Sequence, residues 1–261
     1  MTTATTVTAI DPPRTSLVGS MVRTTIGFSL IALGSTICFM IALFLLPSRP
    51  ARIKLCNYYG KTVGYAIMRI VGARPIVTNR ERIDAAYPAI YVANHTSMLE
   101  AFVSIWLCPV GGCGVFKRQI LFIPFFGQLL FLSGHLRIDR ADRGKSIAAF
   151  AEIARLVKKD RLAIWIMPEG TRSRDGRLLP LKLGFVHLAI ATGLPIVPMV
   201  FHDAHRIWPW GKLRYRPADF RVDVLEPIST VGWTEENARD HATLVHDAMA
   251  SALDKGQKPL A

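Results

Sequence analysis

A histidine and a glutamate, His95 and Glu100, stand close together just after a short apolar run at residues 89–93. The run is predicted to form a buried strand, and a helix is predicted to begin close to Met98. With His95 in the loop and Glu100 in the first helical turn, the two side chains can meet. A carboxylate bound to one imidazole nitrogen fixes the tautomer and leaves the other nitrogen as a base. The pair is therefore a candidate for general-base chemistry.

The same glutamate also has a purely structural interpretation. Ser97 and Glu100 have the spacing of a capping box, in which the serine is the N-cap of a helix and the glutamate is at position N3. A loop histidine such as His95 is, taken alone, more often a hydrogen-bonded structural residue than a base. Both interpretations of Glu100 can hold at once, because a carboxylate has two oxygens.

A second polar cluster follows the apolar run at residues 162–167. Its sequence is Pro168-Glu169-Gly170-Thr171-Arg172-Ser173-Arg174. A loop of this composition presents backbone N–H groups, hydroxyls and planar guanidinium groups together, and these groups bind phosphate. The alternative for this cluster alone is an ordinary exposed basic turn.

The elements that must position these clusters are short apolar runs alternating with longer helical patterns from Arg74 onward. The predicted strands are residues 75–78, 89–93, 114–117, 136–139, 162–167, 196–201 and 220–225. The predicted helices are residues 98–107, 144–159, 184–192 and 235–254. This alternation predicts an α/β domain in which helices flank a largely buried mixed sheet.

The composition of the 261-residue chain is both apolar and basic. Hydrophobic residues make up 51%, the mean hydropathy is +0.29, and 32 Lys and Arg against 19 Asp and Glu give a net charge of +13. This apolar content excludes a disordered chain. An apolar, basic chain indicates nucleic acid or an anionic membrane as a partner. We expect no nucleic acid, because the basic residues are spread along the chain without a nucleic-acid-binding motif.

An uncharged apolar run extends over residues 26–46. As a helix it would be about 31 Å long, and the hydrocarbon core of a bilayer is roughly 30 Å thick. The run is longer than the apolar part of a signal peptide, which is usually about 7 to 15 residues. We expect a retained membrane helix that spans or dips into the bilayer. A buried core helix is the alternative.

The flanks of this run predict its orientation and the organisation of the chain. Basic residues are more numerous after the run than before it, so the positive-inside rule places the remainder on the cytoplasmic face of the cell membrane. Residues 53–71 are predicted either to lie on the membrane surface as an amphipathic helix or to pack on the domain. The expected parts are a flexible leader at 1–25, a membrane-associated helical segment at 26–71 and the α/β domain at 72–261.

Cysteines and further histidines give weaker signals. The four cysteines, at positions 38, 56, 108 and 113, lack the paired spacing of a zinc site and are expected to be reduced and mostly buried. His202 and His205, joined to His95 and Glu100, would suggest a metal-dependent hydrolase. Two histidines at this spacing are a weak signal, so we expect no metal and keep the hydrolase as a minor alternative.

Together the two polar clusters form part of a larger pattern over about residues 75–202. Its blocks are Asn94-His95 with Glu100, then Gly134, Ile138 and Arg140, then Pro168 to Ser173, and finally Pro195-Ile196-Val197-Pro198. Lys117-Arg118 and the residues at 123–127 fit the same pattern. In content and order these blocks resemble the glycerolipid acyltransferases, most closely the bacterial 1-acyl-sn-glycerol-3-phosphate acyltransferases.

The resemblance implies transfer of a fatty acyl group from acyl-CoA or acyl carrier protein to the sn-2 hydroxyl of lysophosphatidate at the phospholipid bilayer, giving phosphatidic acid. His95 would act as the general base, and Glu100 would orient its imidazole. No acyl-enzyme is needed, and the sequence contains no Gly-x-Ser-x-Gly nucleophile motif. The implied reaction uses no cofactor apart from the acyl donor.

The substrate-binding residues implied by the resemblance come from two blocks and the segment between them. They are Lys117, Arg140, Glu169, Gly170, Thr171 and Arg172. Arg172, with the amides of Gly170 and Thr171, would hold the acceptor phosphate, while the other two cations add positive charge. Glu169 is expected to organise Arg172 or the hydroxyl of the acceptor.

One residue departs from the family's pattern. Glu100 stands where the family has Asp, which adds a methylene to the orienting carboxylate, so that His95 sits farther away or the helix shifts. Two alternatives stay open for this reason. One is acylation of another lyso-lipid, such as lyso-ornithine lipid or a lysophospholipid with a head group. The other is a catalytically silent membrane-binding relative.

An apolar stretch at residues 119–135 contains Phe122, Phe125, Phe126 and Phe131. We expect it to line a groove for an acyl chain near the bilayer. A buried helix of the core is the alternative.

Overall fold

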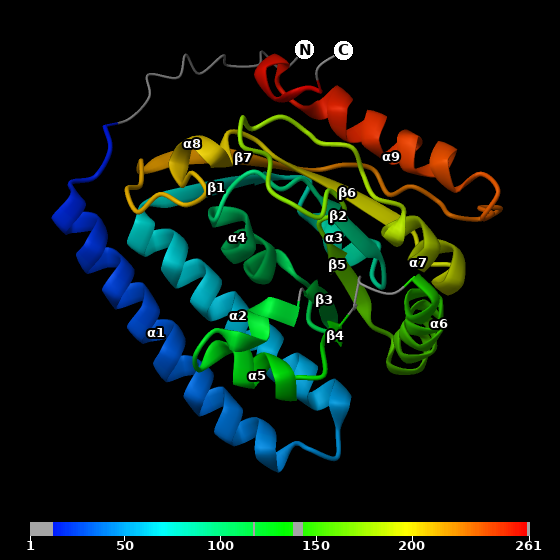
Figure 1. Cartoon of the computed structure of the whole chain (residues 1–261), viewed down its shortest axis with the longest axis horizontal. Coiled ribbons are helices and arrows are strands. Elements are labelled where there is room, and N and C mark those ends of the chain that lie inside the picture. The colour runs from blue at the N-terminus through cyan, green and yellow to red at the C-terminus, as the bar shows by residue number, and fades with distance from the viewer. Residues whose placement is uncertain (1–12, 117, 138–142, 260–261) are drawn as a thin grey trace.

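A mixed sheet of seven strands forms the centre of the described structure (Figure 1). The computed structural model describes residues 13–116, 118–137 and 143–259. The strands are β1 (Ala73–Thr78), β2 (Ile90–Ala93), β3 (Gly112–Phe116), β4 (Leu136–Arg137), β5 (Ala163–Ile166), β6 (Ile196–Phe201) and β7 (Ala218–Val224). Their spatial order is β1-β7-β6-β2-β5-β3-β4, and all neighbours are parallel except β6 and β7. Each predicted strand overlaps an observed one, so the α/β class with a mixed sheet is confirmed.

Helices cover both faces of this sheet. They are α1 (Leu17–Phe44), α2 (Arg49–Val71), α3 (Glu81–Ala85), α4 (Leu99–Leu107), α5 (Phe126–Leu132), α6 (Arg143–Asp160), α7 (Gly184–Thr192), α8 (Ala204–Ile207) and α9 (Ala238–Ala252), with 3₁₀ helices η1 (Arg118–Phe122) and η2 (Lys255–Gln257). Helices α2, α4 and α8 pack on one face, and α6, α7 and α9 on the other (Figure 1). The sequence pattern predicts α4, α6, α7 and α9, but it starts α9 too early and misses the short helices α3, α5 and α8.

Strand β2 lies between β5 and β6 and is parallel to both. All three strands are buried along their whole length, which explains their nearly continuous apolar sequences. Because parallel strands end at the same edge of a sheet, the segments that follow β2, β5 and β6 emerge side by side. This topology brings the two polar clusters of the sequence to one edge.

Helix α1 begins earlier than the apolar run. It starts at Leu17, and the side chain of Ser16 caps it by accepting a hydrogen bond from the N–H of Gly19 at 3.0 Å. Thr15 is also bonded to Tyr215 of the domain through backbone and side chain. The prediction of a flexible leader is therefore wrong for residues 17–25, because a local cap and a distant contact fix the start of the helix. Residues 1–12 lie outside the described residues.

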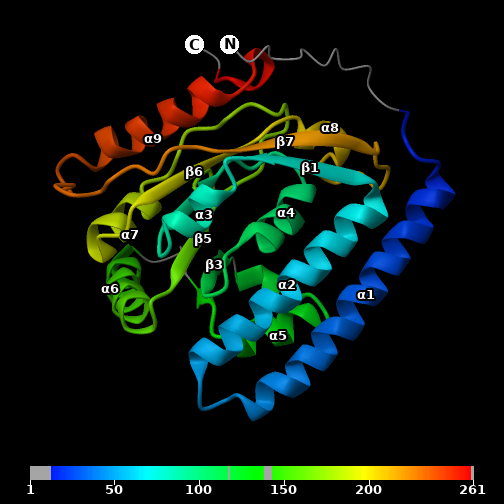
Figure 2. The same ribbon diagram turned by 180° about the vertical axis from the view of Figure 1, so that it is seen from behind.

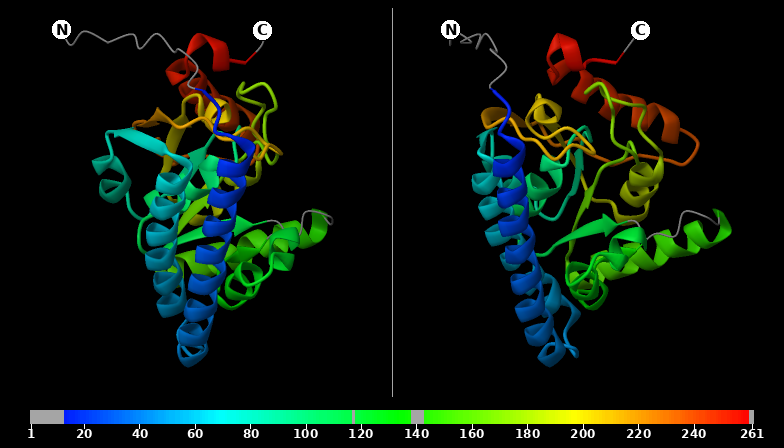
Figure 3. Two further views of the ribbon diagram at one scale, coloured as in Figure 1. Left: turned by 90° about the vertical axis from the view of Figure 1, so that its left-hand side faces the viewer. Right: turned by 60° about the vertical axis from the view of Figure 1, so that its left-hand side comes forward.

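Helix α2 packs against the domain and does not stand apart from it. Its residues Ile67 and Met68 belong to the same buried cluster as side chains of β2 and β6. Of the two interpretations of residues 53–71, packing on the domain is the one that the structure shows. Helix α1 lies antiparallel along α2, joined to it by a hydrogen bond from Arg23 to the carbonyl of Ile70 at 2.8 Å (Figures 2 and 3). The segment predicted at 26–71 is therefore in contact with the domain that follows it.

Two glycines on α2 face the helix that carries Glu100. A Cβ at Gly64 would lie 2.5 Å from the carbonyl oxygen of Phe102 in α4. At Gly60, one turn earlier, a Cβ would lie 3.4 Å from the Cβ of Ile105, which is an ordinary contact. Gly64 therefore sets how closely α2 approaches α4.

The outward side of α1 and the segment from η1 to α5 expose apolar side chains, which we call the apolar surface. It includes Leu17, Val18, Met21, Val22, Ile26, Phe28, Leu33, Ile37, Met40, Phe44, Phe122, Ile123, Phe125 and Phe131. Helix α1 packs on α5 through Cys38, Ala42 and Leu129, so the two parts of this surface adjoin. By length and composition α1 can cross a membrane, and only 22% of its most apolar window is buried. A buried core helix is therefore the wrong interpretation for α1 and for the phenylalanine-rich stretch.

The contact between α2 and α4 gives a matched test at two glycines of one helix. We expect Gly64→Ala to lower the free energy of unfolding by about 1–3 kcal/mol, because the added methyl group overpacks the contact with the Phe102 carbonyl. Gly60→Ala should be neutral or stabilising by up to about 1 kcal/mol, because alanine favours the helix. Thermal unfolding in detergent measures both. Equal effects of the two substitutions would contradict the proposed packing.

Candidate active site

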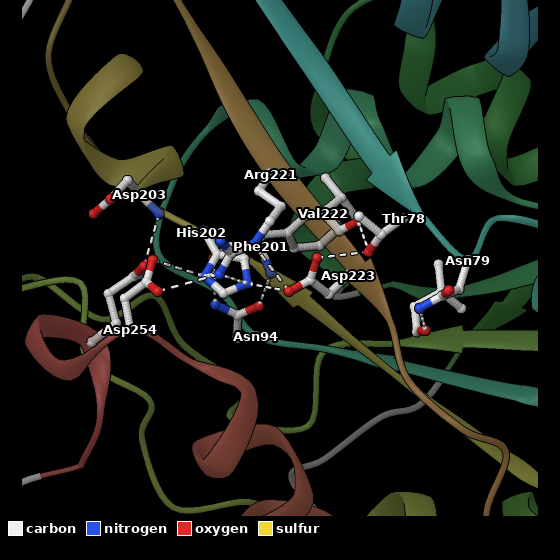
Figure 4. A network of polar contacts seen from close by, with 12 residues as sticks. Thr78, Asn79, Asn94, Phe201, His202, Asp203, Arg221, Val222, Asp223 and Asp254 are labelled. Carbon is white, nitrogen blue, oxygen red and sulfur yellow. Dashed lines mark hydrogen bonds and ion pairs between the residues drawn. The ribbon is translucent and has the colours of Figure 1, made fainter. Parts of the chain in front are cut away.

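The loop after β2 places His95 and Glu100 in direct contact. The side chain of Asn94 anchors this loop to β6 by accepting a hydrogen bond from the Phe201 N–H at 2.8 Å and donating one to its carbonyl at 3.0 Å (Figure 4). His95 Nδ1 then lies 2.9 Å from Glu100 Oε2. Since a carboxylate accepts hydrogen bonds, this contact favours the neutral tautomer that carries the proton on Nδ1 and leaves Nε2 as the acceptor. The predicted meeting of the two side chains is what the structure shows.

Glu100 also binds the residues just before helix α4, but it does not form the predicted capping box. Its carboxylate accepts hydrogen bonds from the Thr96 N–H at 2.7 and 2.8 Å and from the Thr96 hydroxyl at 2.6 Å. Ser97 is not the N-cap, because α4 begins at Leu99 and the cap residue is Met98. The Ser97 hydroxyl instead accepts from the Leu99 N–H at 3.0 Å. One fully buried carboxylate thus both binds Thr96 ahead of the helix and contacts the histidine, and the extra methylene of Glu still permits a direct bond.

Glu169 joins the loop after β5 to the loop after β2. Its side chain is buried, and it accepts hydrogen bonds from the His95 N–H at 2.6 Å and from the Leu179 N–H at 3.0 Å. The Ser173 N–H donates to the His95 carbonyl at 2.8 Å, so both backbone groups of His95 are held by this loop. The Glu169 carboxyl group thus reaches the backbone of His95 and Leu179 and has no bond to Arg172 among the described residues, while its expected role toward the acceptor hydroxyl stays a prediction.

The two carboxyl groups have different surroundings. Burial raises the pKa of Glu169 to about 8, opposed by the two backbone N–H groups and reinforced by the charge of Glu100. Glu100 instead has the His95 ring and the Thr96 donors around it. The site therefore holds one carboxylate paired with the histidine and a second carboxyl group that favours the neutral form.

Arg172 lies beside the His95–Glu100 pair, and its guanidinium is half-buried. Its Nε donates to the carbonyl of Ser97 at 3.0 Å, and its Cζ lies 4.1 Å from the ring centre of Trp210. Within the described residues, its two terminal nitrogens have no hydrogen-bond partner. An arginine held by Nε and by one face keeps both terminal groups available for an anion.

The other residues predicted to bind the phosphate lie in different surroundings, and some lie outside the described residues. The Gly170 N–H donates to the Met167 carbonyl at 3.2 Å, so it is engaged within the turn and is not the free amide that we expected. Thr171 is exposed beside Arg172, as expected of a ligand. Lys117 and Arg140 lie outside the described residues, as does Ile138. Gly134 has a φ of 84°, a conformation that glycine adopts without strain, before β4.

His202, the first histidine of the hydrolase alternative, lies in a separate network (Figure 4). Its Nε2 is 2.8 Å from Asp223 and its Nδ1 is 3.2 Å from Asp254. In the described part of the chain, no three His, Cys, Asp or Glu side chains are grouped to hold a metal ion. None of the four cysteines, all within the described residues, forms a disulfide, and three of them are buried. Nothing in this arrangement supports a metal-dependent hydrolase.

Several residues of the site carry no signal in the sequence. Trp208 accepts hydrogen bonds from Ser97 and Met98 through its carbonyl, and Trp210 stacks on Arg172. These tryptophans lie far along the chain from the polar clusters and match no block of the pattern.

Comparison with known proteins identifies relatives of this chain. The family model described as acyltransferase matches residues 74–202. The 1-acyl-sn-glycerol-3-phosphate acyltransferase of Limnanthes douglasii is 39% identical over 89% of this chain and 82% of its own length. The enzyme of that name from Escherichia coli K12 is 37% identical over 64% of this chain and 69% of its own length. The crystal structure of the acyltransferase PlsC from Thermotoga maritima superposes with a TM-score of 0.72, at 20% identity, over 90% of this chain and 96% of that one.

Proposed function

The chain belongs to the family of 1-acyl-sn-glycerol-3-phosphate acyltransferases, and on this premise we propose the reaction that its site performs. It moves a fatty acyl group from a thioester donor, acyl-CoA or acyl carrier protein, to the sn-2 hydroxyl of 1-acyl-sn-glycerol-3-phosphate. The products are phosphatidic acid and a free thiol, so the enzyme serves phospholipid biosynthesis. The observation that carries this proposal is the 2.9 Å contact between His95 Nδ1 and Glu100, with Arg172 beside it.

In this mechanism His95 is a general base. Its Nε2 takes the proton of the acceptor hydroxyl while the hydroxyl oxygen attacks the thioester carbonyl. The tetrahedral intermediate then collapses, the C–S bond breaks, and the imidazolium returns the proton to the thiolate. Such proton transfers are typically worth about 10² to 10⁴ in rate. Glu100 holds the Nδ1 proton in place and stabilises the positive charge that forms on the ring.

The acceptor is recognised by its phosphate in this proposal. The terminal nitrogens of Arg172 match two phosphate oxygens, and a planar guanidinium binds such a group in bidentate fashion. Thr171, the exposed residue before Arg172 in the chain, is proposed to contribute its backbone amide. Lys117 and Arg140 are further cations proposed from the family pattern.

The enzyme works at the membrane, in our proposal, with the apolar surface in one leaflet and the domain on the cytoplasmic side. Helix α1 is joined to α2 by Arg23 with Ile70 and by Ser35 with Tyr59 at 2.9 Å. Helix α2 carries charged residues along its length, which the hydrocarbon core disfavours. Helix α1 lies along α2 (Figure 3). We therefore propose that α1 dips into the leaflet on its apolar side and does not span the bilayer alone.

Acyl transfer by the full chain in vesicles tests the reaction, with lysophosphatidate, lyso-ornithine lipid and a head-group lysophospholipid as acceptors and both donors offered. We expect lysophosphatidate to be preferred. His95→Ala should lower kcat by about 10² to 10⁴. Glu100→Gln should cause a loss of similar order, because an amide can donate to Nδ1 and so stabilise the wrong tautomer.

The matched control is the surface pair His187 and Glu235, which has the same residue types in contact. His187→Ala and Glu235→Gln should leave kcat unchanged. Full activity of a folded His95→Ala variant would contradict the mechanism. Preference for another acceptor would contradict the proposed substrate and leave the proposed role of His95 as the base unchanged.

Membrane association has its own test on α1. Leu33 and Ile37 are 64% and 51% exposed on the apolar surface, so Leu33→Asp with Ile37→Asp should release the protein from vesicles of anionic phospholipid without unfolding it. Val231→Asp is the control, because Val231 is 91% exposed but lies outside the apolar surface. Sedimentation with vesicles measures the bound fraction. Unchanged binding of the double variant would contradict the proposed orientation.

A further inference from the structure

We propose that Trp210 is a positioning residue, whose indole ring holds the Arg172 guanidinium in the orientation that receives the acceptor phosphate. The inference rests on the proposed function, in which Arg172 binds that phosphate. It adds a residue from the loop between α8 and β7, a segment with no block of the family pattern.

Arg172 is held on two sides. Nε donates to the Ser97 carbonyl at 3.0 Å, which fixes one edge of the guanidinium plane. The Trp210 ring covers one face, with 4.1 Å between Cζ and the ring centre. The remaining edge carries the two terminal nitrogens, which have no protein hydrogen bond among the residues described. Nε alone leaves the plane free to rotate about the bond to Ser97, whereas the ring stops this rotation.

The loop that carries Trp210 is itself tied to the site. The Trp208 carbonyl accepts from the Ser97 hydroxyl at 2.7 Å, and the Trp208 ring stacks on Phe102 of α4 with 5.9 Å between ring centres. A β-bridge pairs Pro209 with Ser97. Ser97, whose carbonyl receives the Arg172 Nε bond, is therefore also bound to Trp208 and Pro209, the two residues that precede Trp210.

The far end of the same loop is fixed to the start of α1. The Tyr215 ring packs edge-on against Trp208 at 4.8 Å, and Tyr215 is hydrogen-bonded to Thr15 through its backbone. Arg214 also donates to the Thr15 carbonyl at 3.0 Å. With both ends anchored, the loop holds the Trp210 ring at a constant place over the guanidinium.

The exposure of Trp210 indicates a role in binding more than in folding. Its side chain is 52% exposed, so it contributes little to the core. Tryptophan is the best aromatic partner for a cation, and a guanidinium that is already oriented loses less conformational freedom when the phosphate arrives. The ring should therefore raise the affinity for the acceptor and leave the affinity for the donor unchanged.

The test compares Trp210→Ala, Trp210→Leu and Trp210→Phe in the full chain. We expect the Ala and Leu variants to raise KM for lysophosphatidate by about three- to thirty-fold, with kcat, KM for the donor and Tm unchanged. The Phe variant should recover most of the affinity, because it restores an aromatic face. Leu213→Ala, at an exposed position of the same loop, is the matched control and should change nothing. In an Arg172→Ala background, Trp210→Ala should have no further effect.

Direct binding of two ligands separates this inference from the proposed function. Calorimetry with lysophosphatidate and with monoacylglycerol, which lacks the phosphate, should show that Trp210→Ala weakens only the former. Wild-type protein that binds lysophosphatidate in this Trp210-dependent way but does not acylate it would contradict the proposed function and support the inference. The inference is overturned if folded Ala and Leu variants keep the wild-type Kd for lysophosphatidate, or if they weaken both ligands equally.

Discussion

The buried carboxylate of Glu100 is the group on which the site depends. It is fully buried, and its hydrogen bonds come from the backbone and hydroxyl of Thr96 and from the ring of His95. A buried carboxylate without such donors is strongly disfavoured, so these bonds are conditions of the fold as well as of the chemistry. They fix the loop after β2, the first turn of α4 and the imidazole together. Any change that moves α4, including one at its contact with Gly64, therefore reaches the histidine.

The sheet supplies the rest of the geometry through its strand order. Because β2 lies between β5 and β6, the residues that follow it have neighbours on both sides. Asn94 is bonded to the end of β6, and both backbone groups of His95 are bonded to the loop after β5. Glu169, which looks from its position in the sequence like a substrate ligand, accepts a hydrogen bond from the His95 N–H and so holds the backbone of the histidine. Arg172 completes this arrangement as the cation beside it.

The sequence predicts those features that depend on local pattern. Buried parallel strands require nearly continuous apolar runs, and such runs mark the three central strands β2, β5 and β6. The five-residue spacing of His95 and Glu100 predicts their contact, since a loop residue and the first helical turn meet. The predicted capping box was wrong, because α4 begins at Leu99 with Met98 as its cap residue. The Ser97 hydroxyl instead donates to the carbonyl of Trp208, a residue far away in the chain. The start of α1 and the Trp210 contact depend on partners far away in the chain, and no local pattern reports such contacts.

The central claim is that Glu100 holds His95 with its proton on Nδ1 and leaves Nε2 as the base. The most direct measurement is the ¹⁵N chemical shift of the His95 ring in protein labelled at histidine, assigned by the loss of its signals in His95→Gln. At neutral pH the account predicts a protonated Nδ1 and an unprotonated Nε2. A neutral His95 ring protonated at Nε2, with Nδ1 unprotonated, would contradict it.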